Sequence, residues 1–557
     1  MPNPVAVNDL SPISGSLQTS RISYAVETAG KDYGQDYNGT TWYSDIPQNG
    51  SQYTIISDNY TANYYVSRSN AEGAYVEGGL PAVDEYSAPV FWLTAGTSSL
   101  DIITIVNGLP DRRGQIPFNS GSQALNWIIS SSNYFAVGPP YEQINADSLG
   151  LYVNGGQIIS YPTTMSAWYD ISGQNNRFTL TNGPTYNSSG WINFDGSDDY
   201  AVAVNTTLPS NATSSFTLMA VARTSGGGNY QTVLGTGGLF SEIGFYVNNS
   251  FMYGRNGGGG GNLYSNGGAI TTGRFYHLAM TYNGSTATAY LNGVATQTGV
   301  NIGSNGGTNG VHVLSTYTPS AASEMLTGDI AEAYVYTQAI SASDVAQSYY
   351  GGPIVTSSLL AAYDAGNLVS YPKSGTTVYN LTGSGTGTLT NGVGYNNIYG
   401  GTFNFDGADD YINLGQINYT NVTVEGWVFR DDTTDLVNIV SGAGVVQYFG
   451  VYSQTLAYYA SIDTGGWTFG TTTLQPQTWY HVAITYNDSN YAVKMYLNGN
   501  LESTSTANAS YRTGYVSTLG TYNNASIRFW KGYISNLRIY GTALTQAQIQ
   551  QNYNATK

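Results

Sequence analysis

Short alternating runs of apolar and polar residues recur along the chain and predict strands rather than long helices. Residues 276–282 (Tyr-His-Leu-Ala-Met-Thr-Tyr) and 480–486 (Tyr-His-Val-Ala-Ile-Thr-Tyr) alternate in the way expected of a strand with one buried face. The next runs, 287–291 and 492–497, each lead into Asn-Gly, a pair that suits a hairpin turn because both turn positions need positive φ. This pattern favours an all-β fold.

The chain contains an internal repeat. The offset between matching segments falls from 211 residues (194 to 405) to 204 residues (328 to 532), so the two copies differ only by short loop changes. Each copy ends with a capping-box spacing, Ser341 to Asp344 and Thr545 to Gln548, which predicts a short terminal helix. The matching segments are Tyr-Pro at 161 and 371, x-Tyr-Asp/Asn-x-Ser/Thr-Gly at 168 and 378, Thr-Leu-Thr-Asn-Gly at 179 and 388, Phe-Asp-Gly-x-Asp-Asp-Tyr at 194 and 405, Tyr-His-x-Ala-x-Thr-Tyr-Asn at 276 and 480, Tyr-Leu-Asn-Gly at 290 and 496, and the runs 328–336 and 532–540.

These patterns divide the chain into three parts. We expect residues 146–352 and 353–557 to form two tandem jelly-roll β-sandwiches, preceded by a smaller, mainly β domain at residues 1–145. In that first part, residues 54–56, 64–67, 90–93 and 101–106 are predicted strands. The run from Gly108 to Gly114 is predicted to be a turn. An anchoring or assembly role is expected for this part from its position ahead of the repeats.

The composition excludes several classes of function. Only 9% of the 557 residues are charged, and the net charge is −17, which argues against a basic surface for nucleic acid. The absence of cysteine excludes thiol nucleophiles and thiolate zinc sites. The first ten residues lack the features of a signal peptide, and the apolar stretch at 88–106 is interrupted by polar residues, so we expect neither secretion by that route nor membrane insertion.

The repeated motifs resemble the laminin-G-like branch of the concanavalin A-like lectin/glucanase superfamily over residues 148–557. The resemblance implies a curved β-sandwich, often sugar-binding, sometimes calcium-dependent and sometimes purely adhesive. Tandem copies also resemble modules of tail, fibre and decoration proteins of tailed phages. The expected function is therefore that of a virion surface protein of a prokaryotic virus that binds host or environmental glycans without chemistry.

That expectation includes partners and alternatives. Other virion proteins would bind the N-terminal part, and the protein would be a homo-oligomer or be present in many copies on the particle. A purely structural capsid or tail spacer and a bacterial cell-surface adhesin are the alternatives. An enzyme is not expected, because the Glu-x-Asp-x-x-Glu run of glucanases with this fold is missing. Its nearest approach, Glu324, Asp329 and Glu332, has no acid in the second copy at the positions of Asp329 and Glu332.

Acidic and aromatic residues supply the candidate sites. Calcium, the one cofactor considered, could take carboxylate oxygens from the repeated Asp motif, whereas the alternative is an Asp-Gly turn capped by its own Asp side chains. Sugar binding needs aromatic faces for stacking and polar groups for hydroxyls. The candidate metal ligands are Asp195, Asp198, Asp199, Asp406, Asp409 and Asp410. The candidate sugar-binding residues are Tyr253, Arg255, Tyr264, Tyr452, Tyr459 and Trp467.

Overall fold

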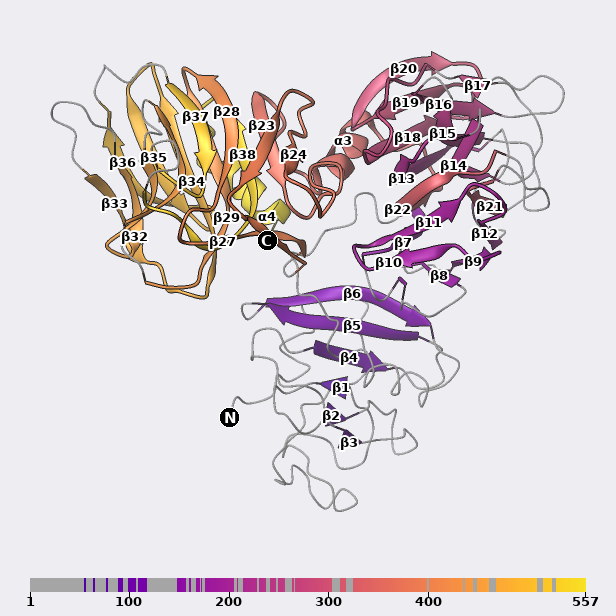
Figure 1. Cartoon of the computed structure of the whole chain (residues 1–557), viewed down its shortest axis with the longest axis horizontal. Helices are drawn as coiled ribbons and strands as arrows, with labels where there is room; N and C mark the ends of the chain where they lie inside the picture. Colours follow the sequence, from indigo (N-terminus) through magenta and orange to yellow (C-terminus); the bar gives the residue numbers. More distant parts are fainter. Residues whose placement is uncertain are drawn as a thin grey trace.

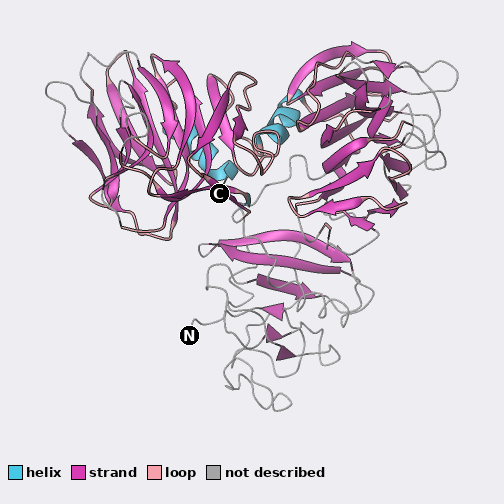
Figure 2. Ribbon diagram, in the orientation of Figure 1, coloured by secondary structure: helices cyan, strands magenta, loops and turns pink. Residues whose placement is uncertain are grey.

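A computed structural model gives the arrangement of the chain (Figure 1). It describes residues 148–556 apart from short segments of at most eight residues, and, before residue 148, only the backbone of six strands. Strands dominate the described part, and helix is confined there to short segments (Figure 2). The predicted all-β class with two jelly-roll sandwiches is confirmed. None of the helices in the described part has the length and apolar character needed to span a membrane.

Repeat 1, here the elements β7 to α3, consists of two eight-stranded antiparallel sheets. The first contains, in spatial order, β10 (Thr185–Asn187), β11 (Trp191–Asp195), β22 (Thr327–Tyr336), β13 (Phe216–Thr224), β18 (Tyr276–Tyr282), β19 (Ala287–Leu291) and β20 (Val294–Val300), with β7 (Leu149–Asn154) also paired to β22. The second contains β17 (Leu263–Tyr264), β16 (Ser250–Arg255), β15 (Ser241–Tyr246), β14 (Tyr230–Thr236), β21 (Val311–Leu314), β12 (Tyr200–Val204), β9 (Arg177–Thr181) and β8 (Ala167–Tyr169). The helix α3 (Ala342–Tyr350) follows β22.

Repeat 2, the elements β23 to α4, has the same strand order. Its first sheet contains β26 (Gly394–Asn396), β27 (Thr402–Asp406), β38 (Lys531–Tyr540), β29 (Val422–Arg430), β34 (Trp479–Asn487), β35 (Ala492–Leu497) and β36 (Asn500–Thr506), with β23 (Leu359–Asp364) paired to β38. Its second sheet contains β24 (Thr377–Tyr379), β25 (Thr386–Thr390), β28 (Tyr411–Tyr419), β37 (Gly514–Leu519), β30 (Val437–Ala443), β31 (Tyr448–Tyr452), β32 (Thr455–Tyr459) and β33 (Trp467–Thr473). The helix α4 (Gln546–Thr556) ends the described chain.

Each repeat has its own hydrophobic core between the two sheets. In repeat 1 the core includes Phe194 from the first sheet and Phe245 from the second, both almost fully buried. In repeat 2 the core includes Phe405 from the first sheet and Phe449 from the second. Burial of such apolar surface is the main term that stabilises a sandwich of this kind.

The predicted hairpins and helix starts are confirmed. Asn292 and Gly293 have φ values of 52° and 75°, as the Asn-Gly turn requires. Ser341 and Asp344 form both hydrogen bonds of the capping box at the start of α3. The prediction of one buried face was wrong for β18, all of whose residues are buried. The reason is that Ala279 on its outer face packs in a second cluster with Val345 of α3.

The backbone before residue 148 contains β1 (Ile55–Ile56), β2 (Tyr64–Tyr65), β3 (Glu77–Gly78), β4 (Pro89–Leu93), β5 (Ser99–Val106) and β6 (Leu109–Pro117). The four predicted strands of this region correspond to β1, β2, β4 and β5. The predicted turn at 108–114 is wrong, because most of it lies in β6, which pairs with β5. Pro110 is compatible with a strand here because β6 is at the edge of its sheet.

Candidate functional site

The outer face of the second sheet of repeat 2 carries a group of aromatic side chains. Along β31, Phe449 and Val451 belong to the core, while Tyr448 and Tyr452 alternate with them and therefore lie on the opposite face. Strands β32 and β33 add further rings to that face. We name this group the aromatic patch, and it consists of Tyr448, Tyr452, Tyr459, Trp467 and Phe469.

Trp467 is the centre of the aromatic patch. Strand pairing aligns Trp467 with Tyr459 and Tyr459 with Tyr448, so three neighbouring strands contribute one row of rings. The Trp467 ring centroid lies 4.7 Å from that of Tyr448, 4.7 Å from that of Tyr452 and 4.9 Å from that of Tyr459. Tyr452, Tyr459 and Trp467 are half-buried and Phe469 is 39% exposed, so parts of these rings face solvent. The structure thus brings together the three candidate residues predicted in repeat 2.

A guanidinium group borders the aromatic patch. The central carbon of Arg528 lies 4.6 Å from the ring centroid of Tyr522, 5.4 Å from that of Tyr448 and 6.0 Å from that of Trp467, within the range of cation–π attraction. Among the residues that the structure describes, no carboxylate lies within ion-pair distance of Arg528. The sequence prediction missed Arg528, because nothing in its local sequence connects it with strands β31–β33.

The candidate residues of repeat 1 do not form a matching surface. Tyr253 is fully buried and belongs to the core, because it pairs with Ile243 on the inward-facing side of its sheet. Tyr264 is half-buried, stacks on Tyr253 at 5.6 Å and donates a hydrogen bond from its hydroxyl to the Asn301 carbonyl. The Arg255 side chain and the glycine run at 257–261 lie outside the described residues. We therefore do not extend the sugar-binding prediction to Tyr253.

Repeat 1 instead contains a carboxyl pair on the outer face of the same sheet. Burial, followed by the neighbouring charge of Glu324, raises the pKa of Glu242 to about 8. The Thr232 hydroxyl donates a hydrogen bond of 2.5 Å to Glu242. Tyr230 and Tyr246 lie beside this pair with ring centroids 4.8 Å apart. The sequence prediction noted Glu324 only as part of an acidic run and missed Glu242.

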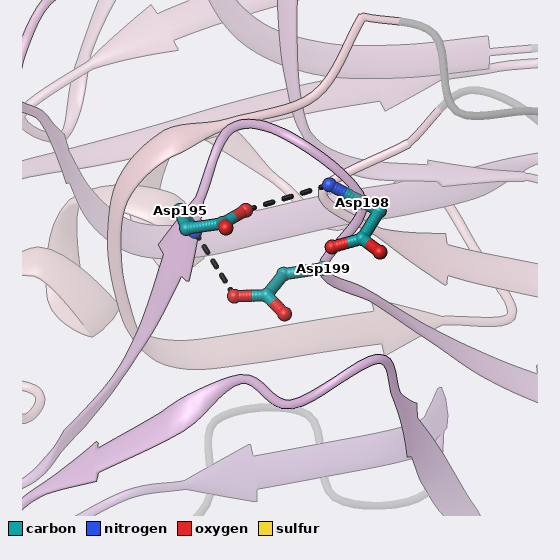
Figure 3. A group of neighbouring side chains, drawn as sticks. All are labelled: Asp195, Asp198 and Asp199. Atoms are coloured by element: carbon teal, nitrogen blue, oxygen red, sulfur yellow. Dashed lines mark hydrogen bonds between the residues drawn. The ribbon is translucent and has the colours of Figure 1, made fainter.

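The Asp motif of repeat 1 forms a compact turn between β11 and β12 (Figure 3). Asp195 Oδ1 accepts hydrogen bonds from the backbone N–H groups of Ser197 at 2.7 Å and Asp198 at 3.4 Å. Asp199 Oδ2 accepts one from the N–H of Asp195 at 3.1 Å. The Asp-Gly turn, which was the alternative to a calcium site, is therefore present. Its backbone hydrogen bonds give Asp195 and Asp199 a role in holding the turn, whether or not an ion binds.

The same turn recurs in repeat 2. Asp406 accepts the N–H of Ala408 at 2.7 Å, and Asp410 accepts the N–H of Asp406 at 2.9 Å. In both turns one carboxylate oxygen from each of the three Asp residues lies within 4.8 Å of the others. Burial, with the two neighbouring carboxylates adding to it, raises the pKa of Asp199 and of Asp410. The donor type and spacing fit a hard cation such as calcium.

The other two acids of the run from Glu324 to Glu332 form hydrogen bonds with structural partners. Asp329 accepts a hydrogen bond of 2.5 Å from the Arg223 guanidinium. Glu332 accepts hydrogen bonds from Tyr334 and Asn154, and burial raises its pKa. These two carboxylates are thus held by separate structural partners, and neither joins the Glu242–Glu324 pair in the contacts described.

Two tandem jelly-roll sandwiches, one of them with exposed aromatic rings on a sheet, define a lectin-like class of protein. A family profile described as the concanavalin A-like lectin/glucanases superfamily matches residues 195–346 and 406–550, which is 297 of the 557 residues. The chain belongs to this superfamily, and the resemblance seen in its motifs is confirmed. A search of curated proteins gave no match.

Several solved structures are similar to this chain. Domain 4 of an extracellular GH43 arabinanase from Geobacillus stearothermophilus, in complex with arabinotriose, is 21% identical, with 34% of this chain and 96% of that chain covered and a TM-score of 0.28. The binding domain of botulinum neurotoxin serotype D is 12% identical, with 72% and 98% covered and a TM-score of 0.30. The CBM40 of a Ruminococcus gnavus sialidase, bound to sialyllactose, is 13% identical, with 24% and 83% covered and a TM-score of 0.20.

Proposed function

We propose that this protein binds carbohydrate without chemistry, and that the aromatic patch of repeat 2 is the binding surface. The observation that carries the proposal is the cluster of half-buried rings around Trp467 on the outer face of a sheet. Membership of a superfamily that contains lectins supports it. Aromatic rings stack on the C–H faces of sugars, and a nearby polar group can fix a hydroxyl or a charged substituent.

The test is binding of the whole protein to a panel of polysaccharides, with analysis of the medium for released sugars. We expect saturable binding without products, and we expect Trp467→Ala to weaken it roughly tenfold or more, because stacking and cation–π contacts are lost together. Tyr411→Ala is the matched control, since Tyr411 is half-buried on β28, which β37 and β30 separate from β31 in the sheet. Unchanged binding by the Trp467 variant would contradict the proposal, and released sugars would indicate an enzyme.

The biological setting proposed is the surface of a virion of a prokaryotic virus, as a fibre, decoration or tail adhesin. Repetition of the site over many copies would raise the effective concentration of weak individual sites. The N-terminal part would then bind other virion proteins. Mass spectrometry of purified particles and of envelopes from uninfected cells tests this setting. Presence only in the envelopes would favour a cell-surface adhesin, and a Trp467 variant with normal adsorption but defective particles would favour a spacer.

Calcium at the two Asp turns is part of the same proposal. Asp195, Asp198 and Asp199 in repeat 1, and their counterparts in repeat 2, would hold the ion and stabilise the loop. The binding panel is therefore run with calcium and with chelator. The turn of repeat 2 leads into β28, and β37 and β30 lie between β28 and β31 in the sheet, so we expect calcium to affect stability more than the affinity for sugar.

A further inference from the structure

The two repeats place one charged residue each at the same position of the fold. Glu324 and Arg528 both lie three residues before the long strand of their repeat, β22 or β38. Both have left-handed backbone, with φ values of 58° and 63°. The carbonyl of Glu324 accepts the N–H of Thr232 at 2.8 Å, and that of Arg528 accepts the N–H of Asn438 at 3.0 Å. The two side chains therefore start from equivalent backbone but carry opposite charges.

The surface beside this position also differs between the repeats. Thr232 pairs with Gly244 in repeat 1, and Asn438 pairs with Gly450 in repeat 2, which fixes the correspondence of the neighbouring strands. By this register, the row Tyr448, Tyr459 and Trp467 of repeat 2 corresponds to Glu242, Gly254 and Leu263 of repeat 1. Repeat 1 thus lacks the row of rings and has a second carboxyl group where repeat 2 has Tyr448.

We propose that repeat 2 recognises an anionic glycan, with Arg528 binding its carboxylate or sulfate group while Trp467 and its neighbours stack on the sugar. The inference rests on the proposed function and specifies its ligand. A guanidinium without an ion-pair partner among the described residues has N–H donors available for an anion. Its planar group can donate two parallel hydrogen bonds, one to each of two oxygens of a carboxylate or sulfate. The chain as a whole is acidic, with net charge −17, so a general attraction for anions is not available.

Repeat 1 carries the opposite kind of charged residue at this position of the fold. At the equivalent position it presents Glu324 beside Glu242, and neither carboxyl group can supply the cation that an anionic ligand needs. The two sandwiches therefore differ in ligand charge, and the anionic glycan occupies repeat 2 alone.

The experiment compares matched charged and neutral polysaccharides with the whole protein. The pairs are polygalacturonate and its methyl ester, hyaluronan and its methyl ester, and dextran sulfate and dextran, measured by calorimetry at constant ionic strength. For at least one pair we expect the charged member to bind roughly tenfold or more tightly than the neutral one, as charge-assisted hydrogen bonds allow. The dextran pair distinguishes sulfate from carboxylate as the source of charge.

Arg528→Met tests the residue, because methionine keeps much of the aliphatic packing on the rings and removes the charge. We expect this variant to lose the preference for the charged member while its affinity for the neutral member stays the same. Arg177→Met is the control, since Arg177 is an exposed arginine on β9 of repeat 1 and its loss changes net charge equally. We expect it to keep the preference.

The outcomes separate this inference from the function on which it rests. If Trp467→Ala weakens both members of a pair but Arg528→Met leaves their ratio unchanged, sugar binding stands and anion recognition by Arg528 is rejected. Equal weakening of both members by Arg528→Met would make the arginine a packing residue only, and would also reject the inference. If no member of any pair binds but another polysaccharide of the panel does, sugar binding stands and anion recognition is rejected.

Discussion

His312 illustrates how single buried residues make the stability of this fold depend on pH. It is fully buried on β21, and neither ring nitrogen has a hydrogen-bond partner among the described residues. Burial lowers its pKa from 6.5 to about 3. Between these two values the unfolded chain binds a proton that the folded chain does not, so the free energy of unfolding falls as the pH decreases from 6.5 towards 3.

We predict that His312→Leu stabilises the protein, and more so at pH 5 than at pH 8. At both pH values it removes an unsatisfied polar group from the core. At pH 5 it also restores the free energy of unfolding that the wild type loses because only its unfolded chain binds the proton, about 2 kcal/mol over the 1.5 pH units between 6.5 and 5. Denaturant unfolding at the two pH values measures this difference. An equal gain at both would show that His312 is not held neutral by burial.

At the scale of the residue, sequence patterns predicted turns and caps better than binding side chains. Asn292 and Ser341 were predicted correctly because a turn or a cap depends on residues within four positions. Tyr253 was predicted at the surface but belongs to the core, since inward and outward positions on a strand differ by one residue. Arg528 was missed because it meets Trp467 only through the pairing of distant strands, although its alignment with Glu324 was a usable signal.

The Asp turn is the element in which structural and metal-binding roles can be separated. Asp410 accepts the N–H of Asp406 and lies beside two other carboxylates, whose repulsion adds to the effect of burial on its pKa. In chelator, we predict that Asp410→Asn is as stable as the wild type or more so, because the amide oxygen can accept the same hydrogen bond and one negative charge is removed. Asp410→Ala is the control and should lose about 1 kcal/mol with that hydrogen bond.

Calcium should make the wild type more stable than Asp410→Asn. If the turn holds the ion, calcium raises the unfolding temperature of the wild type and raises that of Asp410→Asn less, since a ligand charge is missing. Thermal unfolding of both proteins in calcium and in chelator measures the effect. The same response to calcium in both would leave the turn with its hydrogen-bonding role alone. The motif predicted the three ligand candidates from sequence, but only the folded turn shows which oxygens the backbone already uses.

At the scale of the molecule, the two sandwiches are joined by more than the chain between them, and α3 lies at their junction (Figure 1). Tyr349 of α3 is buried, and its hydroxyl donates a hydrogen bond of 2.7 Å to the Leu381 carbonyl of repeat 2. Asn367 donates one of 2.8 Å back to the Tyr349 carbonyl. The Arg274 guanidinium carbon lies 4.1 Å from the ring centroid of Tyr379. The sequence predicted two repeats but not this junction, because Tyr349, Asn367 and Arg274 lie outside the repeated motifs.

A junction of this kind should make the two sandwiches unfold together. Trp191 of repeat 1 and Leu368 and Val369 of repeat 2 share one apolar cluster with Tyr349, so unfolding either repeat exposes apolar surface of the other. We predict a single calorimetric transition for repeats 1 and 2 in the wild type. Tyr349→Ala should divide it into two, because the variant loses about 3–5 kcal/mol of buried aromatic packing together with the hydrogen bond across the junction.

The control for this prediction is Tyr282→Ala, which removes a buried tyrosine from the core of repeat 1 and leaves the junction intact. It should lower the temperature of the shared transition without dividing it, since the repeats remain coupled. Two transitions already present in the wild type would contradict the coupling. Retention of a single transition by Tyr349→Ala would place the coupling in the other junction contacts, such as Arg274 with Tyr379.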